Sequence, residues 1–226
     1  MPPDDPAPSN SASRPTIPGP AVKRLCLYLR ELESFAETGQ TTVSSKQLGE
    51  LLGLTDAQVR KDLAYFGQFG QPGIGYEVAP LVTELRRVLG TDKPWHVALV
   101  GVGNLGRALI AHAGFEKKGF HIKAVFDSNP ALAGESIHGR KVLPMKDLKR
   151  TIQRQGIRLG VIAVPAPAAQ AVCDKLVAAG VKGVINFAPK RLRVDPEVSI
   201  VSVDLAVQLE QLAFQVSLLT PGDGAS

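Results

Sequence analysis

The sequence has little of what disulfide scaffolds, metal sites and membrane proteins need. Its two cysteines, Cys26 and Cys173, stand far apart within apolar helical patterns, which predicts neither a disulfide nor a metal site. No run of about 18 apolar residues is present, as a transmembrane helix requires, and the N-terminus lacks the pattern of a secretory signal. We therefore expect a cytoplasmic protein without membrane contact.

A strongly basic N-terminal part is also absent. Residues 21–90 contain as many Lys and Arg as Asp and Glu. The excess of Lys and Arg that gives the chain its net charge of +5 lies in residues 91–199. A basic protein can bind polyanions, but bulk charge does not single out a nucleic-acid-binding domain here. Evidence for such a domain must come from the positions of individual Lys and Arg residues.

The N-terminal part does contain a series of helix signals. Residues 1–20 hold seven prolines and predict a disordered tail. From Ala21, apolar residues recur every three or four positions up to Gly39, as in an amphipathic helix. Ser44 and Thr55 each precede a glutamine by three positions, which is the spacing of a capping box, and they begin two further helices joined by a tight turn.

The second of these two helices is typical of a DNA recognition helix. Its inner face consists of Val59, Leu63 and Phe66. Small residues and cations form the opposite face, namely Ala57, Arg60, Lys61 and Ala64. With the glycine-rich hairpin expected at 66–78, this pattern predicts a winged helix-turn-helix domain at residues 21–90. A three-helix bundle with a solvated face is the alternative.

Six residues of this domain are candidates for DNA contact. Arg60 and Lys61 suit base edges and phosphates, and Gln58 can pair with adenine. The remaining candidates have hydroxyl groups that suit phosphate oxygens: Ser44, Ser45 and Tyr65. Each of the six could instead be an ordinary solvated side chain.

From Trp95 the hydrophobic pattern changes its period. Five nearly continuous β-branched or apolar runs follow: HVALVG, HIKAVFD, RLGVIAV, KGVINFA and VSIVSVD. Helical patterns stand between them, notably at 167–179. Buried parallel strands that alternate with helices predict a doubly wound α/β sheet of the Rossmann type at residues 91–204. An apolar stripe then predicts a helix at 205–219, followed by a short tail at 220–226.

The loop after the first strand has the fingerprint of a dinucleotide site. In GVGNLG, the first glycine makes the turn, the second lets the backbone approach a pyrophosphate, and the third allows close helix packing. Asp127, at the end of the second strand, suits the hydroxyls of the adenosine ribose and repels a 2′-phosphate, so NAD(H) is favoured over NADP(H). The candidate residues are Gly101, Val102, Gly103, Asn104, Leu105, Gly106 and Asp127.

Two other functions fit the same motif. An NAD-dependent oxidoreductase with an N-terminal regulatory domain needs a proton donor or acceptor beside the nicotinamide. Of the four histidines, only His112 stands near the glycine loop, and no segment remains for a substrate domain. A site for coenzyme A or another nucleotide is the second alternative, against which Asp127 argues.

Several segments together resemble the bacterial redox-sensing repressors of the Rex family. They are RLCLYLRELE, SSKQLGELLGLTDAQVRKDLAYFGQFG, GVGNLG, VFDSNP, INFAP and SVDLA. The resemblance covers nearly all of residues 21–219. It implies a homodimer that exchanges its C-terminal helix between subunits, and it implies that NADH and NAD⁺ are the cofactors and palindromic operator DNA the partner.

The resemblance also implies roles in switching. Arg30 and Asp204 match the family's switch pair, whereas His112 stands where a tyrosine is often found and Leu205 where an aromatic residue reaches the partner's nicotinamide. The expected lining of the ring is apolar and consists of Val164, Pro165, Phe187, Ala188 and Leu205. Burying the positive ring of NAD⁺ there is costly. We therefore expect NADH to close the dimer and move the two recognition helices off half-sites about 34–36 Å apart.

Overall fold

The computed structural model describes residues 19–65, 67, 69–71 and 73–219. The chain forms two compact units, Met1–Asp92 and Lys93–Ser226. Most of the predicted N-terminal tail, all of the C-terminal tail and the side chain of Phe66 lie outside the described residues. The first helix begins at Gly19, so the last two residues of the predicted tail are helical.

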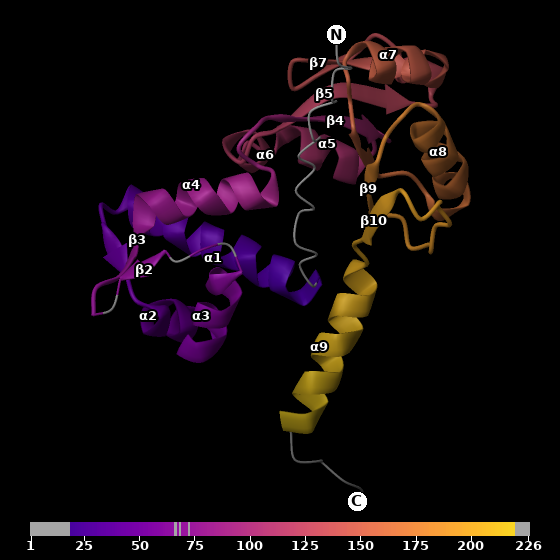
Figure 1. Ribbon diagram of the computed structural model, residues 1–226. Helices are drawn as coiled ribbons and strands as arrows, with labels where there is room; N and C mark the ends of the chain where they lie inside the picture. Colours follow the sequence, from indigo (N-terminus) through magenta and orange to yellow (C-terminus); the bar gives the residue numbers. More distant parts are fainter. Residues whose placement is uncertain (1–18, 66, 68, 72, 220–226) are drawn as a thin grey trace, which may run out of the picture. The chain divides into compact units, whose positions relative to one another are not determined.

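The first unit consists of helices and a small antiparallel sheet (Figure 1). The helices are α1 (Gly19–Glu37), α2 (Ser45–Leu52), α3 (Asp56–Ala64) and α4 (Val78–Leu89). The strands are β1 (Thr42–Val43), β2 (Gly70–Gln71) and β3 (Gly75–Glu77), in the order β1-β3-β2. The predicted hairpin is therefore confirmed as β2 and β3, and β1 is an additional strand.

Local hydrogen bonds explain where α2 and α3 begin. The hydroxyl of Ser44 accepts from the backbone N–H of Gln47 at 3.0 Å, and that of Thr55 accepts from Gln58 N–H at 3.1 Å. Gly53 ends α2 with φ of +66°, a conformation that glycine adopts without strain. The helix-turn-helix predicted from these residues is thus present, and its apolar faces meet α1 and α4 in one core.

The second unit is built on a seven-stranded sheet in the order β10-β9-β8-β4-β5-β7-β6. All neighbours pair in parallel except β6 and β7. The strands are β4 (Trp95–Val100), β5 (Phe120–Asp127), β6 (Ser136–Ile137), β7 (Arg140–Pro144), β8 (Leu159–Ile162), β9 (Gly183–Asn186) and β10 (Ser199–Ser202). Without the edge strand β6, this is the Rossmann strand order, which confirms the predicted fold class.

Helices cover the two faces of this sheet unequally. One face packs against α7 (Leu148–Arg154) and α8 (Ala166–Ala178) in a continuous core. The other face packs against α5 (Asn104–Ala111), with α6 (Gly114–Lys117) beside β5. Two 3₁₀ turns, at Pro130–Leu132 and Met145–Asp147, complete the connections. The second face is left open over β8, β9 and β10, where a hollow of about 490 Å³ has an apolar lining.

The last helix, α9 (Leu205–Leu219), follows β10 and extends away from the sheet (Figure 1). Its described side chains, from Leu205 to Leu218, are all exposed in the single chain.

Throughout the described part of the chain, no helix is both long and apolar enough to cross a bilayer. Cys26 and Cys173 are free thiols.

Candidate cofactor site and DNA-binding face

The three glycines of the loop between β4 and α5 have different surroundings. Gly101 has φ of +101°, and a Cβ atom there would lie 2.4 Å from the carbonyl oxygen of Ala163. A Cβ atom on Gly106 would lie 1.9 Å from the carbonyl oxygen of Gly101, so α5 can approach β4 only with glycine here. No described atom would lie within 4 Å of a Cβ on Gly103. The second glycine therefore leaves the loop backbone open to a ligand.

Asp127 lies at the end of β5 and is bonded to this loop. Its Oδ2 accepts from the backbone N–H of Val102 at 2.7 Å, and its Oδ1 accepts from the N–H of Asn129 at 2.8 Å. These bonds fix the direction of the carboxylate. An ionised carboxylate has about four lone-pair sites, so both oxygens can also accept from the hydroxyls of a ribose.

A cavity of about 450 Å³ opens beside the glycine loop. Of the predicted residues, those that line it are Gly101, Val102, Gly103, Asp127, Val164 and Pro165. From β4 the chain continues to β5 on one side, and the sheet continues with β8 on the other, so the cavity lies at the point where the strand order reverses. Ligands of open α/β sheets bind at this point. The first turn of α5, with Asn104, Leu105 and Gly106, directly follows the loop.

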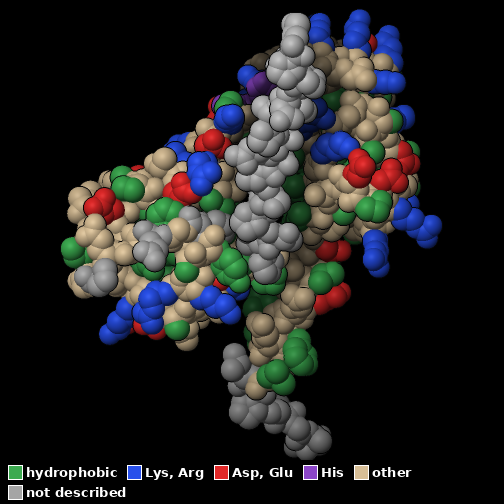
Figure 2. Space-filling model, in the orientation of Figure 1, with side chains coloured by type: hydrophobic (Ala, Val, Ile, Leu, Met, Phe, Trp, Pro, Cys, Tyr) green, Lys and Arg blue, Asp and Glu red, His purple; other side chains and the backbone are tan. Residues whose placement is uncertain are grey.

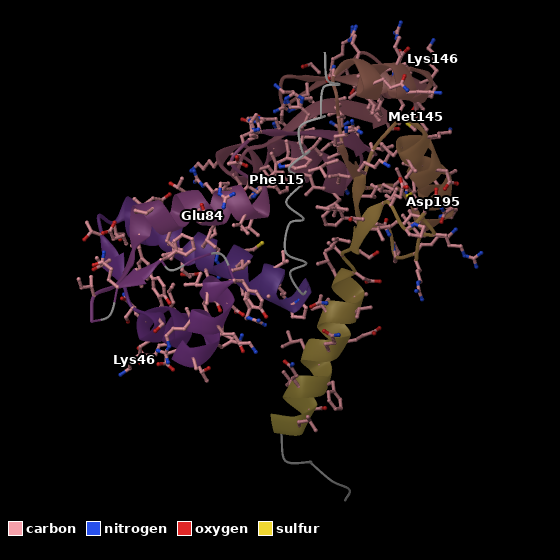
Figure 3. The ribbon with its side chains drawn as sticks, viewed as in Figure 1. Lys46, Glu84, Phe115, Met145, Lys146 and Asp195 are labelled. Carbon is pink, nitrogen blue, oxygen red and sulfur yellow. The ribbon has the colours of Figure 1, made fainter. Side chains whose placement is uncertain are left out.

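Ten residues of the cavity lining were not among the residues predicted from the sequence. Four of them lie within two positions of a predicted residue along the chain, namely Val100, Ser128, Asn129 and Ala163, and six do not. These six are Leu132, Met145, Ala168, Ala171, Val172 and Lys175. Met145 directly follows β7, a strand that was not among the predicted ones, and begins the 3₁₀ turn that also contains Lys146 (Figure 3). The sequence signal for β7 was the short run RKVLP. Because the carboxyl ends of all parallel strands meet at one edge of the sheet, recognising this strand would also have placed Met145 at the cavity.

The other residues predicted around the nicotinamide are not gathered at this cavity in the single chain. Phe187 lines the apolar hollow over β8 to β10. Ala188 is buried, and its N–H donates to the side chain of Asn186 at 3.0 Å. Leu205, the first residue of α9, is 65% exposed. A complete lining would need a further element near these residues.

The predicted switch residues occupy three separate elements. Asp204 caps α9, since its Oδ1 accepts from the N–H of Ala206 at 3.0 Å. His112 follows the last residue of α5 and packs edge-on against Phe115, with ring centroids 4.9 Å apart. Arg30 belongs to α1 of the first unit and donates to Glu31 at 2.9 and 3.0 Å.

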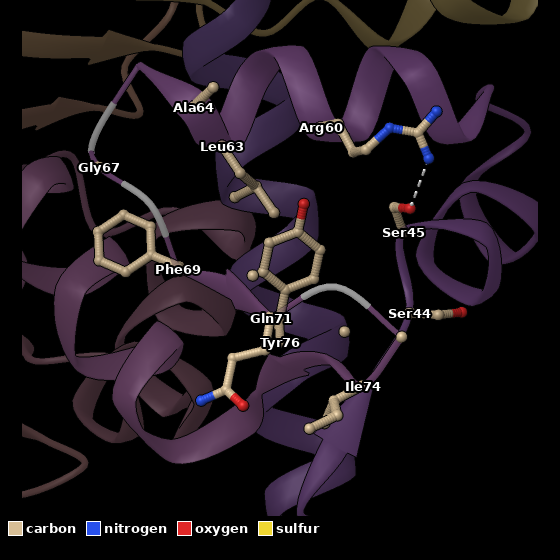
Figure 4. Close-up of a pocket in the computed structure, with 13 residues that line it drawn as sticks. Ser44, Ser45, Arg60, Leu63, Ala64, Gly67, Phe69, Gln71, Ile74 and Tyr76 are labelled. Carbon is tan, nitrogen blue, oxygen red and sulfur yellow. Dashed lines mark hydrogen bonds between the residues drawn. The ribbon is translucent and has the colours of Figure 1, made fainter.

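On the first unit, the candidate DNA contacts surround the exposed face of α3. Lys61 and Tyr65 are exposed, the latter by 48%. Arg60 points toward the start of α2, where its Nη1 donates to Ser45 at 3.2 Å (Figure 4). The same Nη1 donates to Asp56, the first residue of α3, at 2.7 Å. The hydrogen bond from Arg60 lowers the pKa of Asp56. Arg60 is therefore held at the edge of the exposed face of α3, next to the serine hydroxyls.

A groove of about 680 Å³ separates α3 from the β2–β3 hairpin (Figure 4). Ser44, Ser45 and Arg60 line it from the helical side. Ile74, in the turn of the hairpin, lines the opposite side and is 59% exposed. A recognition helix and a hairpin around one groove can contact a nucleic acid with both elements at once.

Sequence reasoning also missed a buried charge cluster behind the exposed face of α3. Asp62 is 2% exposed and accepts from both Arg24 and Tyr28 of α1. Burial alone would raise the pKa of this carboxyl, but hydrogen bonds from Arg24, Tyr28 and Gln58 hold it below its ordinary value. Desolvation and the hydrogen bond to Asp62 raise the pKa of Tyr28. The cluster thus joins α1 to α3 through an ionised carboxylate.

Positive charge is concentrated on the second unit instead. Lys and Arg side chains gather near α7 and β7 (Figure 2), where Lys146 is among them (Figure 3). This agrees with the excess of Lys and Arg in residues 91–199.

No cluster of His, Cys, Asp or Glu that could hold a metal ion occurs in the part of the chain that the structure describes.

Comparison with known families assigns a type to each unit. Residues 16–64 match a family described as a putative DNA-binding protein N-terminus. Residues 92–190 match a family described as a CoA binding domain. The first match covers α1, α2 and α3, and the second covers the glycine loop and the cavity beside it.

Comparison with individual proteins covers both units together. The redox-sensing transcriptional repressor Rex of Carboxydothermus hydrogenoformans is 46% identical over 200 residues, which are 88% of this chain and 96% of that protein. A crystal structure of RSP with NAD⁺ and operator DNA has a TM-score of 0.85 at 36% identity and covers 88% of this chain and 92% of that one. A structure of RSP with NADH has a TM-score of 0.81 at 34% identity, over 89% and 94%.

Proposed function

The chain belongs to the Rex family of redox-sensing transcriptional repressors, and from this premise we propose that it binds operator DNA when free or bound to NAD⁺ and is released by NADH. It is a regulator and not an enzyme, because the relatives are transcriptional repressors. The observation that carries the proposal is the dinucleotide fingerprint in three dimensions. Gly101, Gly103 and Asp127 line one cavity, and Gly106 lets α5 pack closely against the loop.

The cofactor of this site is NAD(H). Gly103 and the first turn of α5 offer backbone N–H groups and the positive end of a helix to the pyrophosphate. Asp127 accepts from the ribose hydroxyls and disfavours a 2′-phosphate. The solved relative RSP has been crystallised with both NAD⁺ and NADH. Coenzyme A, which the family description of residues 92–190 names, carries a 3′-phosphate that Asp127 would also repel.

The reduced and oxidised cofactors differ in the charge of one ring. The ring lies against Val164 and Pro165 at the cavity, and Phe187, Ala188 and Leu205 complete an apolar lining around it when the dimer closes. Taking the positive ring of NAD⁺ out of water without a partner is unfavourable, whereas the neutral ring of NADH can be buried. The closed dimer therefore binds NADH more tightly than NAD⁺, and Arg30, His112 and Asp204 take part in closure.

The assembly is a cytoplasmic homodimer in which α9 of each subunit covers the open sheet face of the other. Two unpartnered apolar surfaces in one chain support this. Leu209, Leu212 and Phe214 of α9 are 54–66% exposed. On the sheet, Ile185 and Val201 are 40% and 60% exposed beside an apolar hollow. Monomeric proteins rarely leave such large apolar surfaces in water.

Two copies of the winged helix-turn-helix suit a palindromic operator. Each α3 enters the major groove of one half-site, with half-sites about 34–36 Å apart for one turn of the duplex. Lys61 faces the bases and phosphates, while Arg60, Ser44, Ser45 and Tyr65 contact phosphates at the edges of the groove. Dimer closure by NADH changes the spacing of the two helices, and the operator is released.

The test is a reciprocal titration. An operator selected from a random duplex library is labelled, and its affinity for the protein is measured by fluorescence anisotropy without cofactor and with NAD⁺, NADH, ADP-ribose or coenzyme A. We expect NADH to weaken operator binding by roughly 5- to 150-fold, the usual range of allosteric coupling, and the operator to weaken NADH binding by the same factor. ADP-ribose, which lacks the ring, should have no such effect. Equal operator affinities with reduced and oxidised cofactor would overturn the proposal.

A further inference from the structure

The buried carboxylate of Asp62 in α3 accepts four hydrogen bonds, from three different side chains. On Oδ2 it accepts from Arg24 Nε at 2.5 Å and from Tyr28 at 2.8 Å. On Oδ1 it accepts from Arg24 Nη2 and from Gln58 Nε2, both at 2.8 Å. Arg24 already neutralises the charge with two bonds. The bond from Gln58 adds to this and also fixes the direction of the Gln58 side chain.

An ionised carboxylate accepts hydrogen bonds and cannot donate them. The amide of Gln58 must therefore turn its NH₂ group toward Asp62, and the flipped orientation would place two acceptors against each other. The direction of a glutamine amide is ordinarily ambiguous, but here the chemistry of the neighbour decides it. The Gln58 carbonyl oxygen and the second N–H of its amide are left to face away from Asp62.

Gln58 occupies a position from which these atoms can reach DNA. It is the third residue of α3, is partly exposed and stands one turn before Asp62. Residues at the N-terminal end of a recognition helix contact base edges in the major groove. One carbonyl oxygen and one N–H side by side are the groups that pair with adenine, by accepting from N6 and donating to N7.

We propose that Asp62 is a positioning residue for base readout, which holds the Gln58 amide in the one orientation that reads an adenine of the operator. The inference rests on the proposed function, because it needs operator binding by α3. Arg24 anchors Asp62 to α1 by hydrogen bonds to both carboxylate oxygens and so keeps the amide in place. The specificity of Gln58 then depends on a carboxylate that never touches the DNA.

The experiment measures base preference separately from overall affinity. Each half-site position of the selected operator is replaced by the three other base pairs, and every adenine is also replaced by 7-deazaadenine, which lacks the N7 acceptor. Wild type should prefer adenine at one position per half-site by roughly tenfold and lose most of this preference to 7-deazaadenine. Gln58→Ala should bind all bases at that position equally and be insensitive to the deaza substitution.

Asp62→Asn tests the positioning role, because an asparagine can accept or donate and lets the Gln58 amide flip. It should lose most of the adenine preference at the same position as Gln58→Ala. Tyr28→Phe is the matched control. It removes a buried hydrogen bond to the other carboxylate oxygen, so it should lower the melting temperature and leave the preference intact. If Asp62→Asn fails to fold, the double variant Arg24→Gln, Asp62→Asn removes the unpaired cation and takes its place.

The outcomes separate this inference from the proposed function. If wild type binds no operator, the proposed function fails first. If wild type binds but Gln58→Ala keeps every base preference, Gln58 does not read a base and the inference is overturned. If Asp62→Asn weakens all sequences by one common factor and keeps the preference, Asp62 has a purely structural role and the inference is overturned as well.

Discussion

A methyl group added to a glycine of the GVGNLG loop would have different effects at different positions. At Gly101 and Gly106 the new atom would meet backbone carbonyl oxygens, which cannot move without shifting a strand. At Gly103 the φ of −72° suits any residue, and no described atom stands in the way. The fold therefore requires glycine at the first and third positions, whereas the second glycine leaves the loop backbone open to a ligand.

This difference predicts that Gly103→Ala folds normally and loses cofactor. The melting temperature without cofactor should stay within about 1 °C of wild type, because a surface change away from special features costs less than about 0.5 kcal/mol. The affinity for NADH should fall by roughly tenfold or more, about 1.4 kcal/mol, because the methyl group keeps the pyrophosphate from the loop. Calorimetry of unfolding and of NADH binding measures both quantities.

Gly106→Ala is the matched contrast on the same loop. Forcing the extra methyl group into a closed contact should cost about 3 kcal/mol of folding free energy, whether or not cofactor is present. If Gly103→Ala bound NADH as tightly as wild type, the cavity beside the loop would not be the pyrophosphate site.

Among single residues, those whose role depends on neighbours along the chain could be predicted from the sequence. Gly101, Gly103 and Gly106 belong to one local fingerprint. Asp62 was not predicted, because its burial depends on α1, 38 residues earlier along the chain. The spacing of four between Gln58 and Asp62, and between Arg24 and Tyr28, placed each pair on one helix face. The sequence did not contain the information that these two faces meet.

Among the elements, helices with their own start and stop signals were predictable. Ser44, Thr55 and Gly53 mark their helix ends through local hydrogen bonds and backbone conformation. The strands β1 and β7 were missed for a different reason. β1 has two residues and β7 has five, with a basic start and a proline at its end, so neither shows a hydrophobic period. Their place comes from pairing with β3 and β5, which is a tertiary contact.

The element that the single chain explains least is α9. Its apolar residues extend beyond one stripe, and polar residues are confined to positions such as Gln208, Gln211 and Gln215. A helix that is apolar nearly all round is ordinarily buried, yet every described side chain of α9 is exposed. Periodicity predicted the helix, but the described part of the single chain does not bury any of its described side chains.

We predict that Leu212→Glu weakens the dimer and that Gln211→Glu does not. A buried carboxylate in place of Leu212 should cost the assembly about 3 kcal/mol, or roughly a hundredfold in dimer affinity. Sedimentation velocity over a concentration series measures this, with Gln211→Glu as a control of equal charge one position earlier. Equal dissociation constants for the two variants would mean that Leu212 stays in water and that α9 does not form the interface.

In the whole molecule, a change in one unit must be transmitted to the other. The residues proposed to bind the cofactor lie in Lys93–Ser226, and those proposed to bind DNA lie in Met1–Asp92. The two are joined after α4, which ends with Gly90 at φ of +70°. Ligands at separate sites can only influence each other through an element that both of them bias. If the connection is short and stiff, a rearrangement of one unit is passed to the other.

Lengthening this connection should therefore abolish the response without harming either site. We predict that about ten Gly and Ser residues inserted between Asp92 and Lys93 leave the affinities for NADH and for operator, each measured alone, within about threefold of wild type. A flexible linker of that composition transmits no fixed orientation. The factor by which NADH weakens operator binding should fall from the roughly 5- to 150-fold range toward one. A control insertion of the same length after Gly134, in a loop of the second unit, should keep the coupling. If coupling survived the insertion between the units, the signal would have to pass through contacts other than this connection, such as those proposed for Arg30 in dimer closure.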